Sequence, residues 1–116
     1  MARGDVLLVS LPASDQREQS GTRPAIAVQT ESTGEPMLMV APVTSNQEAL
    51  RFAFSVPVEP TQLNGLTLRS VVMVFQMRAI DKRRIVRQLG TLSAEDMERV
   101  DVEIWRMLKP PPPDQD

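Results

Sequence analysis

The segment Arg23–Gln29, with the sequence RPAIAVQ, predicts the central β-strand of the fold. Its apolar run Ala25–Val28 presents hydrophobic side chains to both faces of an extended chain, which is typical of a strand with a neighbour on each side. Pro24 fixes its own φ and biases Arg23 toward an extended conformation. The guanidinium of Arg23 stays charged near neutral pH and can donate two hydrogen bonds to a phosphate. The start of this strand therefore predicts an anion-binding position.

Other apolar segments, each bounded by turn-forming residues, predict the remaining strands. The near-continuous apolar run at 37–43 predicts a buried strand, whereas the alternation at 51–58 predicts a half-exposed one. Asn64-Gly65 predicts a tight turn after the latter. The predicted strands besides 23–29 are residues 4–11, 37–43, 51–58, 69–76 and 85–92.

One convincing helix closes the chain. Ser93 is a favourable N-cap, and Asp96 lies three residues on, where a capping-box acid belongs. Apolar residues recur at helical spacing from Met97 and give one apolar face. Pro110–Pro113 ends the helix. Many short strands and one C-terminal helix predict a mainly-β domain over residues 1–109, a strongly curved sheet or partly open barrel, and a Pro-rich, disordered tail over 110–116.

Composition removes several classes of function. The 116 residues include no cysteine and no histidine, which excludes thiolate zinc sites, histidine-based triads and imidazole acid–base pairs. No apolar run approaches the roughly 20 residues of a membrane-spanning helix. The N-terminus lacks the layout of a signal peptide, so we expect a cytoplasmic protein. The net charge is only −2, but residues 78–87 hold five basic side chains against Asp81, which indicates an anionic partner at one face.

Taken alone, each polar motif can be explained by local structure, without a function. Arg23-Pro24 could be a surface arginine at the start of a strand. Residues 44–46 could be an ordinary turn, and residues 76–82 could be a solvated turn in which Asp81 caps the residues that follow. Together, however, these polar segments stand at the ends of apolar strands, where a rigid sheet can present them jointly.

In their order and spacing the motifs resemble the MazF/PemK toxin family. They are GDV at 4–6, EQ-x-G-x-RP at 18–24, PVTS at 42–45, Q-x-R-x-x-DK at 76–82 and LG-x-LS at 89–93, so the similarity covers residues 3 to about 108. It implies an SH3-like β-barrel of the MazF/CcdB plasmid-maintenance-toxin type that forms a homodimer. Most members cut single-stranded RNA at short sequences without metal or cofactor. A cognate antitoxin of the MazE/PemI type neutralises them by laying a flexible segment over the RNA site.

The resemblance also implies roles for individual residues. Arg23 matches the catalytic arginine and Thr44 the hydroxyl residue paired with it, while Glu18 is the nearest candidate for a general base. One branch of the family uses an arginine and an aspartate on the fifth strand, but here Met73 and Phe75 stand at those positions. The implied RNA-binding residues are Arg17, Gln19, Gly21, Ser45, Asn46, Gln76, Arg78 and Lys82.

The expected reaction is attack of the RNA 2′-hydroxyl on the adjacent phosphorus, which gives a 2′,3′-cyclic phosphate and a 5′-hydroxyl. Aromatic residues make up only 3% of the chain, and we assign Phe52, Phe54 and Phe75 to the core, so base reading falls to hydrogen bonds. Two alternatives remain. A non-catalytic toxin of the same fold binds DNA gyrase, although the polar tail here argues against that, and an inactive member could serve only as a partner-binding barrel.

Overall fold

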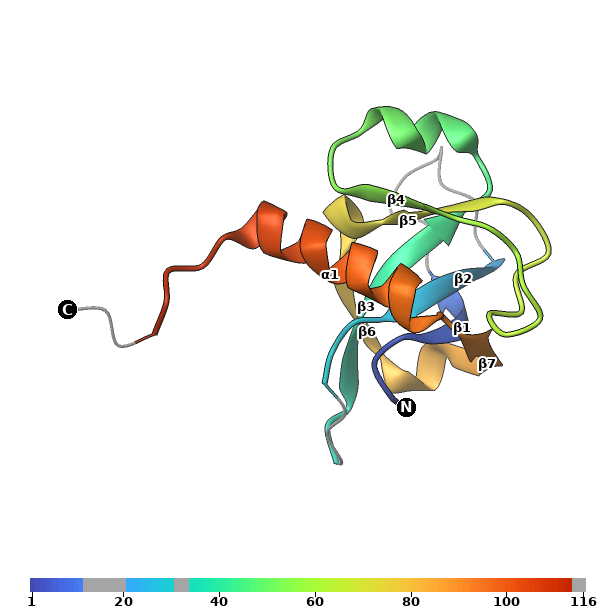
Figure 1. Cartoon of the computed structure of the whole chain (residues 1–116). Helices are drawn as coiled ribbons and strands as arrows, with labels where there is room; N and C mark the ends of the chain where they lie inside the picture. The colour runs from blue at the N-terminus through green and yellow to red at the C-terminus, as the bar shows by residue number, and fades with distance from the viewer. Residues whose placement is uncertain (12–20, 31–33, 114–116) are drawn as a thin grey trace.

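The computed structural model describes residues 1–11, 21–30 and 34–113 (Figure 1). Within them the chain forms short strands, three 3-10 turns and one C-terminal α-helix. The elements are β1 Asp5–Leu11, β2 Gly21–Ala27, β3 Met37–Thr44, η1 Gln47–Arg51, β4 Ser55–Val58, β5 Ser70–Met73, η2 Val74–Gln76, β6 Arg78–Asp81, η3 Lys82–Arg84, β7 Ile85–Thr91 and α1 Ala94–Leu108.

The strands form one antiparallel sheet in the order β4-β5-β3-β2-β1-β7, and β6 pairs with β3 beside β5. β2 lies between β1 and β3, as its two-sided apolar pattern predicts. Ile26 packs into one hydrophobic cluster, whereas Ala25 and Ala27 pack into another on the opposite face. The prediction of a central strand is therefore confirmed.

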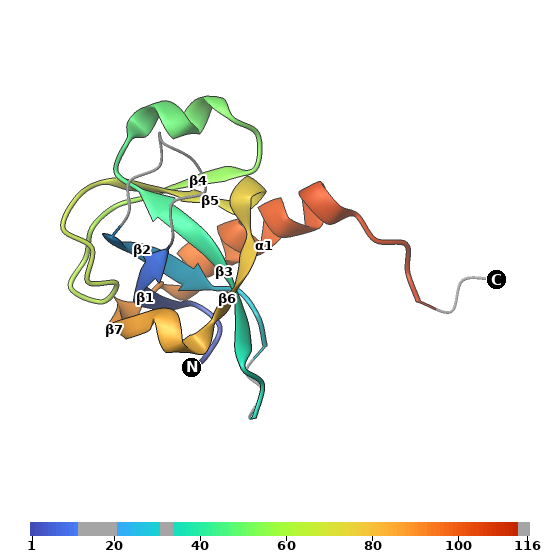
Figure 2. The ribbon, with the colours of Figure 1, turned by 180° about the vertical axis from the view of Figure 1, so that it is seen from behind.

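The two clusters fill the two sides of this sheet. The larger one joins Val6, Ile26 and Val72 to the apolar face of α1, which lies across the sheet in Figure 1 and behind it in Figure 2. The smaller one gathers buried residues of β1, β2, β3 and β6 with Ile85 of β7. These strands curve around it, and η3 connects β6 to β7 where no pairing joins them in the described part of the chain. The predicted mainly-β, partly open barrel with a C-terminal helix is confirmed.

The predicted strand at 51–58 is wrong in its first half. Asn46 accepts a hydrogen bond from the backbone N–H of Glu48 at 3.0 Å and so starts the 3-10 turn η1, which ends at Arg51. Phe54 then has a φ of 62°, in the left-handed region that a bulky side chain rarely adopts. The alternation of Phe52 and Phe54 thus belongs to a bend, and strand pairing begins only at Ser55.

The predicted strand at 69–76 is likewise interrupted. β5 ends at Met73, η2 follows, and the chain returns to β3 as β6, a strand that the sequence had presented as a turn. β3 pairs with β5 through residues 43–44 and with β6 through residues 37–40. Pro42, which offers no N–H to a ladder, stands at the gap between these two pairings. The gap leaves space beside β3 between β5 and β6.

The predicted burial of the whole 37–43 segment is also wrong. Met37 and Met39 are exposed, whereas Leu38 and Val40 are buried in the smaller cluster, and the ladder of β3 with β2 begins only at Val40. The start of β3 therefore projects beyond the central sheet, where alternate side chains meet solvent.

The C-terminal helix begins as predicted, since Ser93 Oγ accepts a hydrogen bond from the Asp96 N–H at 3.1 Å. The Asp96 carboxylate pairs with Arg99 instead of closing a capping box, and Arg99 also donates to the Pro57 carbonyl at 2.9 Å. Arg99 thereby ties the helix to the edge strand β4. With 15 residues, α1 is too short and too polar to cross a membrane, and no other helix in the described residues could do so.

Arg3 ties the same helix to the N-terminal segment. Its guanidinium pairs with Asp101, which raises the pKa of Arg3, and its Nε donates to the Val28 carbonyl at 2.9 Å. Beyond α1, residues 110–113 run away from the sheet in both whole-chain views. The rest of the predicted tail, 114–116, lies outside the described residues.

Asn64 organises the turn between β4 and β5, where a tight turn was predicted. Its buried Oδ1 accepts hydrogen bonds from the N–H groups of Thr61 and Leu66, each at 3.0 Å, and its Nδ2 donates to the Glu59 carbonyl at 2.9 Å. The turn packs directly on β7, since a Cβ at Gly90 would lie 2.2 Å from the Leu63 carbonyl oxygen.

We predict that Asn64→Ala destabilises the fold by about 2–4 kcal/mol, because it leaves the buried Leu66 N–H and the partly buried Thr61 N–H and Glu59 carbonyl without their partner. Urea unfolding followed by circular dichroism measures the change. The exposed neighbour Gln62 serves as a control, and Gln62→Ala should shift stability by less than about 0.5 kcal/mol. Equal stability of the two variants would contradict this role of Asn64.

Candidate RNA-cleavage groove

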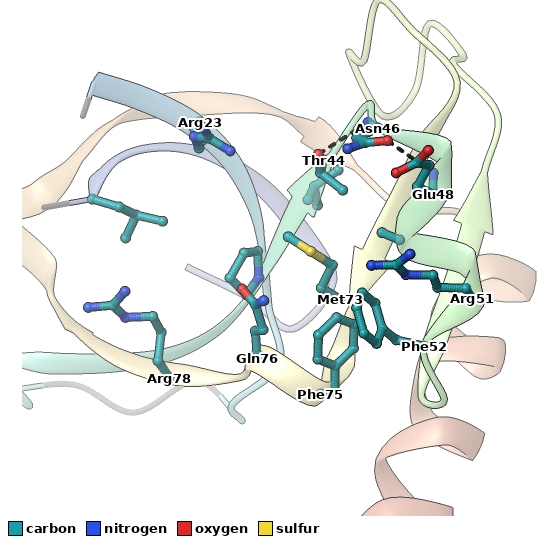
Figure 3. A pocket seen from close by; sticks show the side chains of 14 residues that line it. Arg23, Thr44, Asn46, Glu48, Arg51, Phe52, Met73, Phe75, Gln76 and Arg78 are labelled. Atoms are coloured by element: carbon teal, nitrogen blue, oxygen red, sulfur yellow. Dashed lines mark hydrogen bonds between the residues drawn. The ribbon is translucent and has the colours of Figure 1, made fainter. Parts of the chain in front are cut away.

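A groove of about 330 Å³ lies beside β3, at the gap between β5 and β6. Its walls come from the ends of β1, β2 and β3, from the η1 turn, and from β5, η2 and the start of β6 (Figure 3). A second hollow of about 440 Å³, here called the side hollow, adjoins it. Arg23, Val43, Thr44 and Asn46 line both, so the two hollows adjoin at these residues.

Strand register explains why Arg23 and Thr44 face the same space. Arg23 pairs with Val9, whose side chain is buried in the smaller cluster, and paired residues of adjacent strands project to the same face. Pro42 pairs with Ala25 of that cluster, and Thr44 lies two residues further on β3. The groove therefore continues the concave face of the sheet beyond its apolar filling.

Thr44 is held by the turn that follows it. Its Oγ1 accepts a hydrogen bond from the Asn46 N–H at 3.1 Å, and Asn46 in turn caps η1 through Glu48. A threonine hydroxyl has one hydrogen to donate in addition to its acceptor positions. Since the bond from Asn46 uses only an acceptor position, the Thr44 hydroxyl can still donate to a ligand in the groove.

The charges on the walls favour an anion. Three arginines and one carboxylate line the groove, which gives a formal sum of +2. Figure 3 places Arg23 and Arg78 at one end of the view, with Arg51 and Glu48 at the other. Guanidinium groups bind phosphate through paired N–H donors, so the end that holds Arg23 and Arg78 is suited to a phosphodiester.

The end that holds Arg51 and Glu48 also carries an aromatic surface, which the sequence did not predict. Phe52 is 47% exposed, and its ring centroid lies 5.1 Å from that of Phe75, with Met73 beside them (Figure 3). The assignment of Phe52 to the core is therefore wrong, and Phe75 forms part of the groove wall. Phe54 does pack against the larger cluster. The left-handed bend at Phe54 explains the difference, because it turns its neighbour Phe52 out of the strand pattern.

Comparison with known proteins identifies the family. Residues 2–108 match the family described as PemK-like, MazF-like toxin of type II toxin-antitoxin system. The protein belongs to this family. It is 31% identical over 102 residues to the Endoribonuclease MazF of Staphylococcus saprophyticus, with 86% of this chain and 84% of that protein covered.

Solved structures of MazF toxins have the same fold. MazF of Deinococcus radiodurans superimposes with a TM-score of 0.75 at 23% identity, covering 95% of this chain and 97% of that one. The MazE–MazF structure from the same organism gives a TM-score of 0.73 at 25% identity, with 94% of this chain and 96% of the other covered. The Mycobacterium tuberculosis toxin MazF-mt6 gives 0.73 at 23% identity, with coverages of 90% and 96%.

In this MazF-like chain the predicted site residues divide into three groups. The groove brings together Arg23, Thr44, Asn46, Gln76 and Arg78, and Ser45 lines the side hollow. Gly21 and Lys82 line neither depression. Arg17, Glu18 and Gln19 lie outside the described residues.

Sequence reasoning missed Glu48, Arg51 and Phe52 as groove residues. One feature of the sequence could have revealed them. Asn46 can cap the short segment that follows it, and such a cap predicts a turn before the next strand. Among the described residues, no cluster of three or more acidic, histidine or cysteine side chains could hold a metal ion.

Lys82 lies away from the groove because β6 carries the chain from Arg78 to η3, roughly 13 Å at about 3.3 Å per residue. Asp81 begins η3, as the solvated-turn interpretation expected. Its carboxylate accepts hydrogen bonds from the Arg83 Nη2 and from the Arg83 backbone N–H, each at 2.8 Å. These bonds, the side-chain bond first, lower the pKa of Asp81 to about 2.

We predict that the Asp81 carboxyl titrates near pH 2 in the folded protein, against 3.8 for an unperturbed aspartate. Because the folded-state pKa is depressed, its contribution to stability is present above about pH 4 and is lost as the pH falls toward 2. NMR titration of the carboxyl carbon measures the midpoint. Arg83→Ala should move it toward the ordinary value while Arg87→Ala should not, and an unchanged midpoint in Arg83→Ala would refute the assigned cause.

Proposed function

We propose that the protein is a toxin endoribonuclease that cleaves single-stranded RNA at specific sequences without a metal ion. The observation that supports it most is the convergence of Arg23 and Thr44 on one groove with an excess of positive charge. The relative with 31% identity is an endoribonuclease, and the family match spans almost the whole chain. The groove also has the polar and apolar walls that a nucleotide chain requires.

The proposed reaction begins with the ribose 2′-hydroxyl next to the scissile phosphate. Its oxygen attacks phosphorus as its proton leaves, and the bond from phosphorus to the 5′-oxygen breaks. The products are a 2′,3′-cyclic phosphate and a 5′-oxygen that gains a proton to become a hydroxyl. The reaction needs correct alignment of the attacking oxygen and stabilisation of extra charge on the phosphoryl oxygens.

Arg23 supplies that charge stabilisation in our proposal. Its guanidinium holds two non-bridging oxygens and donates most strongly when their charge rises in the transition state. Thr44, fixed by the Asn46 N–H, donates its hydroxyl hydrogen to the phosphate or to the departing oxygen. Glu18 is the proposed base that removes the 2′-proton, with Glu48 of the groove wall as its alternative. Neither step requires histidine or a metal.

RNA recognition is proposed to involve hydrogen-bonding groups on both sides of Arg23. Ser45, Asn46, Gln76 and Arg78 line the two depressions and can donate to bases or phosphates. Arg17 and Gln19, which lie outside the described residues, and Gly21 at the start of β2 complete the proposed set. We do not extend the proposal to Lys82, which η3 holds outside both depressions.

Partners and location follow the family pattern in this proposal. A solved MazF structure contains MazE, and a mycobacterial endoribonuclease is solved with its cognate antitoxin. We propose that a cognate antitoxin of this type neutralises the present chain, that the toxin acts as a homodimer, and that it acts in the cytoplasm, where its RNA substrate is found.

We predict that Arg23→Ala lowers the rate of single-stranded RNA cleavage by roughly 100- to 1,000-fold, as loss of a transition-state donor does. Arg23→Lys should recover only part of the activity, because an ammonium lacks the planar fork. Cleavage of a long RNA, with mapping of 5′-hydroxyl ends, gives the rate and the recognised sequence. The exposed Arg87 on β7 is a matched control, and Arg87→Ala should cleave normally. Full activity in Arg23→Ala would refute the mechanism.

We predict that cleavage continues at an undiminished rate in excess EDTA, because arginine and hydroxyl donors perform the work of a Lewis acid. The same assay measures it, with a magnesium-dependent nuclease as the positive control for chelation. Loss of activity that returns on adding a divalent cation would show that the reaction needs a metal after all.

A further inference from the structure

The groove has two chemically different ends on either side of Gln76. At one end are the guanidinium groups of Arg23 and Arg78, and at the other are the side chains of Met73, Phe52 and Phe75 (Figure 3). A nucleotide has the same division, because its phosphate is anionic and its base presents flat π-faces. The groove can therefore take a phosphate beside Arg23 and Arg78 and a base beside Phe52.

The apolar end has the geometry of a stacking surface. The rings of Phe52 and Phe75 are tilted by 41° with centroids 5.1 Å apart, so Phe75 supports Phe52 from within the wall. The guanidinium carbon of Arg51 lies 5.0 Å from the centre of the Phe52 ring. Bases of single-stranded RNA stack on aromatic rings and on arginine guanidinium planes. Phe52, Phe75, Arg51 and Met73 are here called the aromatic shelf.

Phe52 lines the groove, whereas more exposed apolar side chains such as Leu68 and Trp105 line neither depression. Phe52 leaves 47% of its surface open beside the bend at Phe54. The side hollow, on the other side of Arg23 and Thr44, has no aromatic residue among those that line it. Among the described residues, the two sides of the proposed cleavage point therefore differ, because an aromatic surface lines one of them and not the other.

We propose that the aromatic shelf binds a nucleobase adjacent to the cleaved phosphodiester and so fixes which bond meets Arg23 and Thr44. This inference rests on the proposed function. Stacking tolerates every base, so the shelf sets the position of the strand, while Asn46, Glu48 and Gln76 around it can read the edge of the base by hydrogen bonds. Met73 and Phe75 thus serve binding at the positions where one branch of the family carries a charged pair.

The test uses fluorescein-labelled octamers of deoxyadenosine, deoxycytidine and thymidine, and an abasic deoxyribose-phosphate octamer. They lack the 2′-hydroxyl, so fluorescence anisotropy reports binding whether or not the protein cleaves RNA. For the wild type we expect the best homopolymer to bind roughly 5- to 150-fold tighter than the abasic strand, the range for one stacked base. Phe52→Ala should lose most of that ratio and leave abasic binding within about twofold.

The controls separate stacking from other effects. Phe52→Trp should retain the ratio, and Leu68→Ala, which removes an exposed apolar side chain outside the groove, should leave all binding unchanged. Arg23→Ala should weaken the abasic and base-containing strands alike, because it removes a phosphate contact. Circular dichroism confirms that each variant is folded.

Two results would overturn the proposal. One is a Phe52→Ala variant whose affinity falls by the same factor for the abasic strand and for the homopolymers, or does not fall for any of these strands. The other is unchanged homopolymer binding together with escape from the cognate antitoxin, which would assign the shelf to a protein side chain. Failure of the wild type to cleave any RNA would instead overturn the proposed function, and the homopolymer ratio would still report on the shelf.

Discussion

The burial of β2 on both faces is the constraint on which the rest of the structure depends. Ile26 contributes to the cluster under α1, and Ala25 and Ala27 contribute to the cluster inside the curved sheet. A strand that buries side chains on both of its faces lies in the middle of the sheet. Its first residues then emerge at the rim of the concave face, so Arg23 points into the groove from a rigid support.

The groove itself results from interruptions of regular structure. The Asn46 cap starts η1, the left-handed bend at Phe54 delays β4, and η2 separates β5 from β6. A continuous strand over residues 69–81 would pair with β3 along its full length and fill this space. The interruptions remove hydrogen bonds between strands, but they leave a space beside Thr44 that charged and aromatic side chains line.

Local chemistry made several features predictable. The Ser93 cap, the Asn64-Gly65 turn, the Asp81 cap and the central position of β2 each follow from side chains within a few residues of one another. The predictions from sequence were wrong where a short segment fits both a strand and a turn. An aromatic residue at every second position is typical of a strand, and it also occurs across a capped turn followed by a bend, as at Phe52 and Phe54.

The sequence by itself determined the mainly-β class with its C-terminal helix and the family resemblance, because those depend on composition, short-range rules and ordered motifs. Only the tertiary structure decided which side chains complete the groove. Phe52 meets Phe75 across more than twenty residues of chain, and β6 places Lys82 away from the groove. The physical reason is that contacts between distant segments depend on where strands break, and those breaks are set by packing against β3.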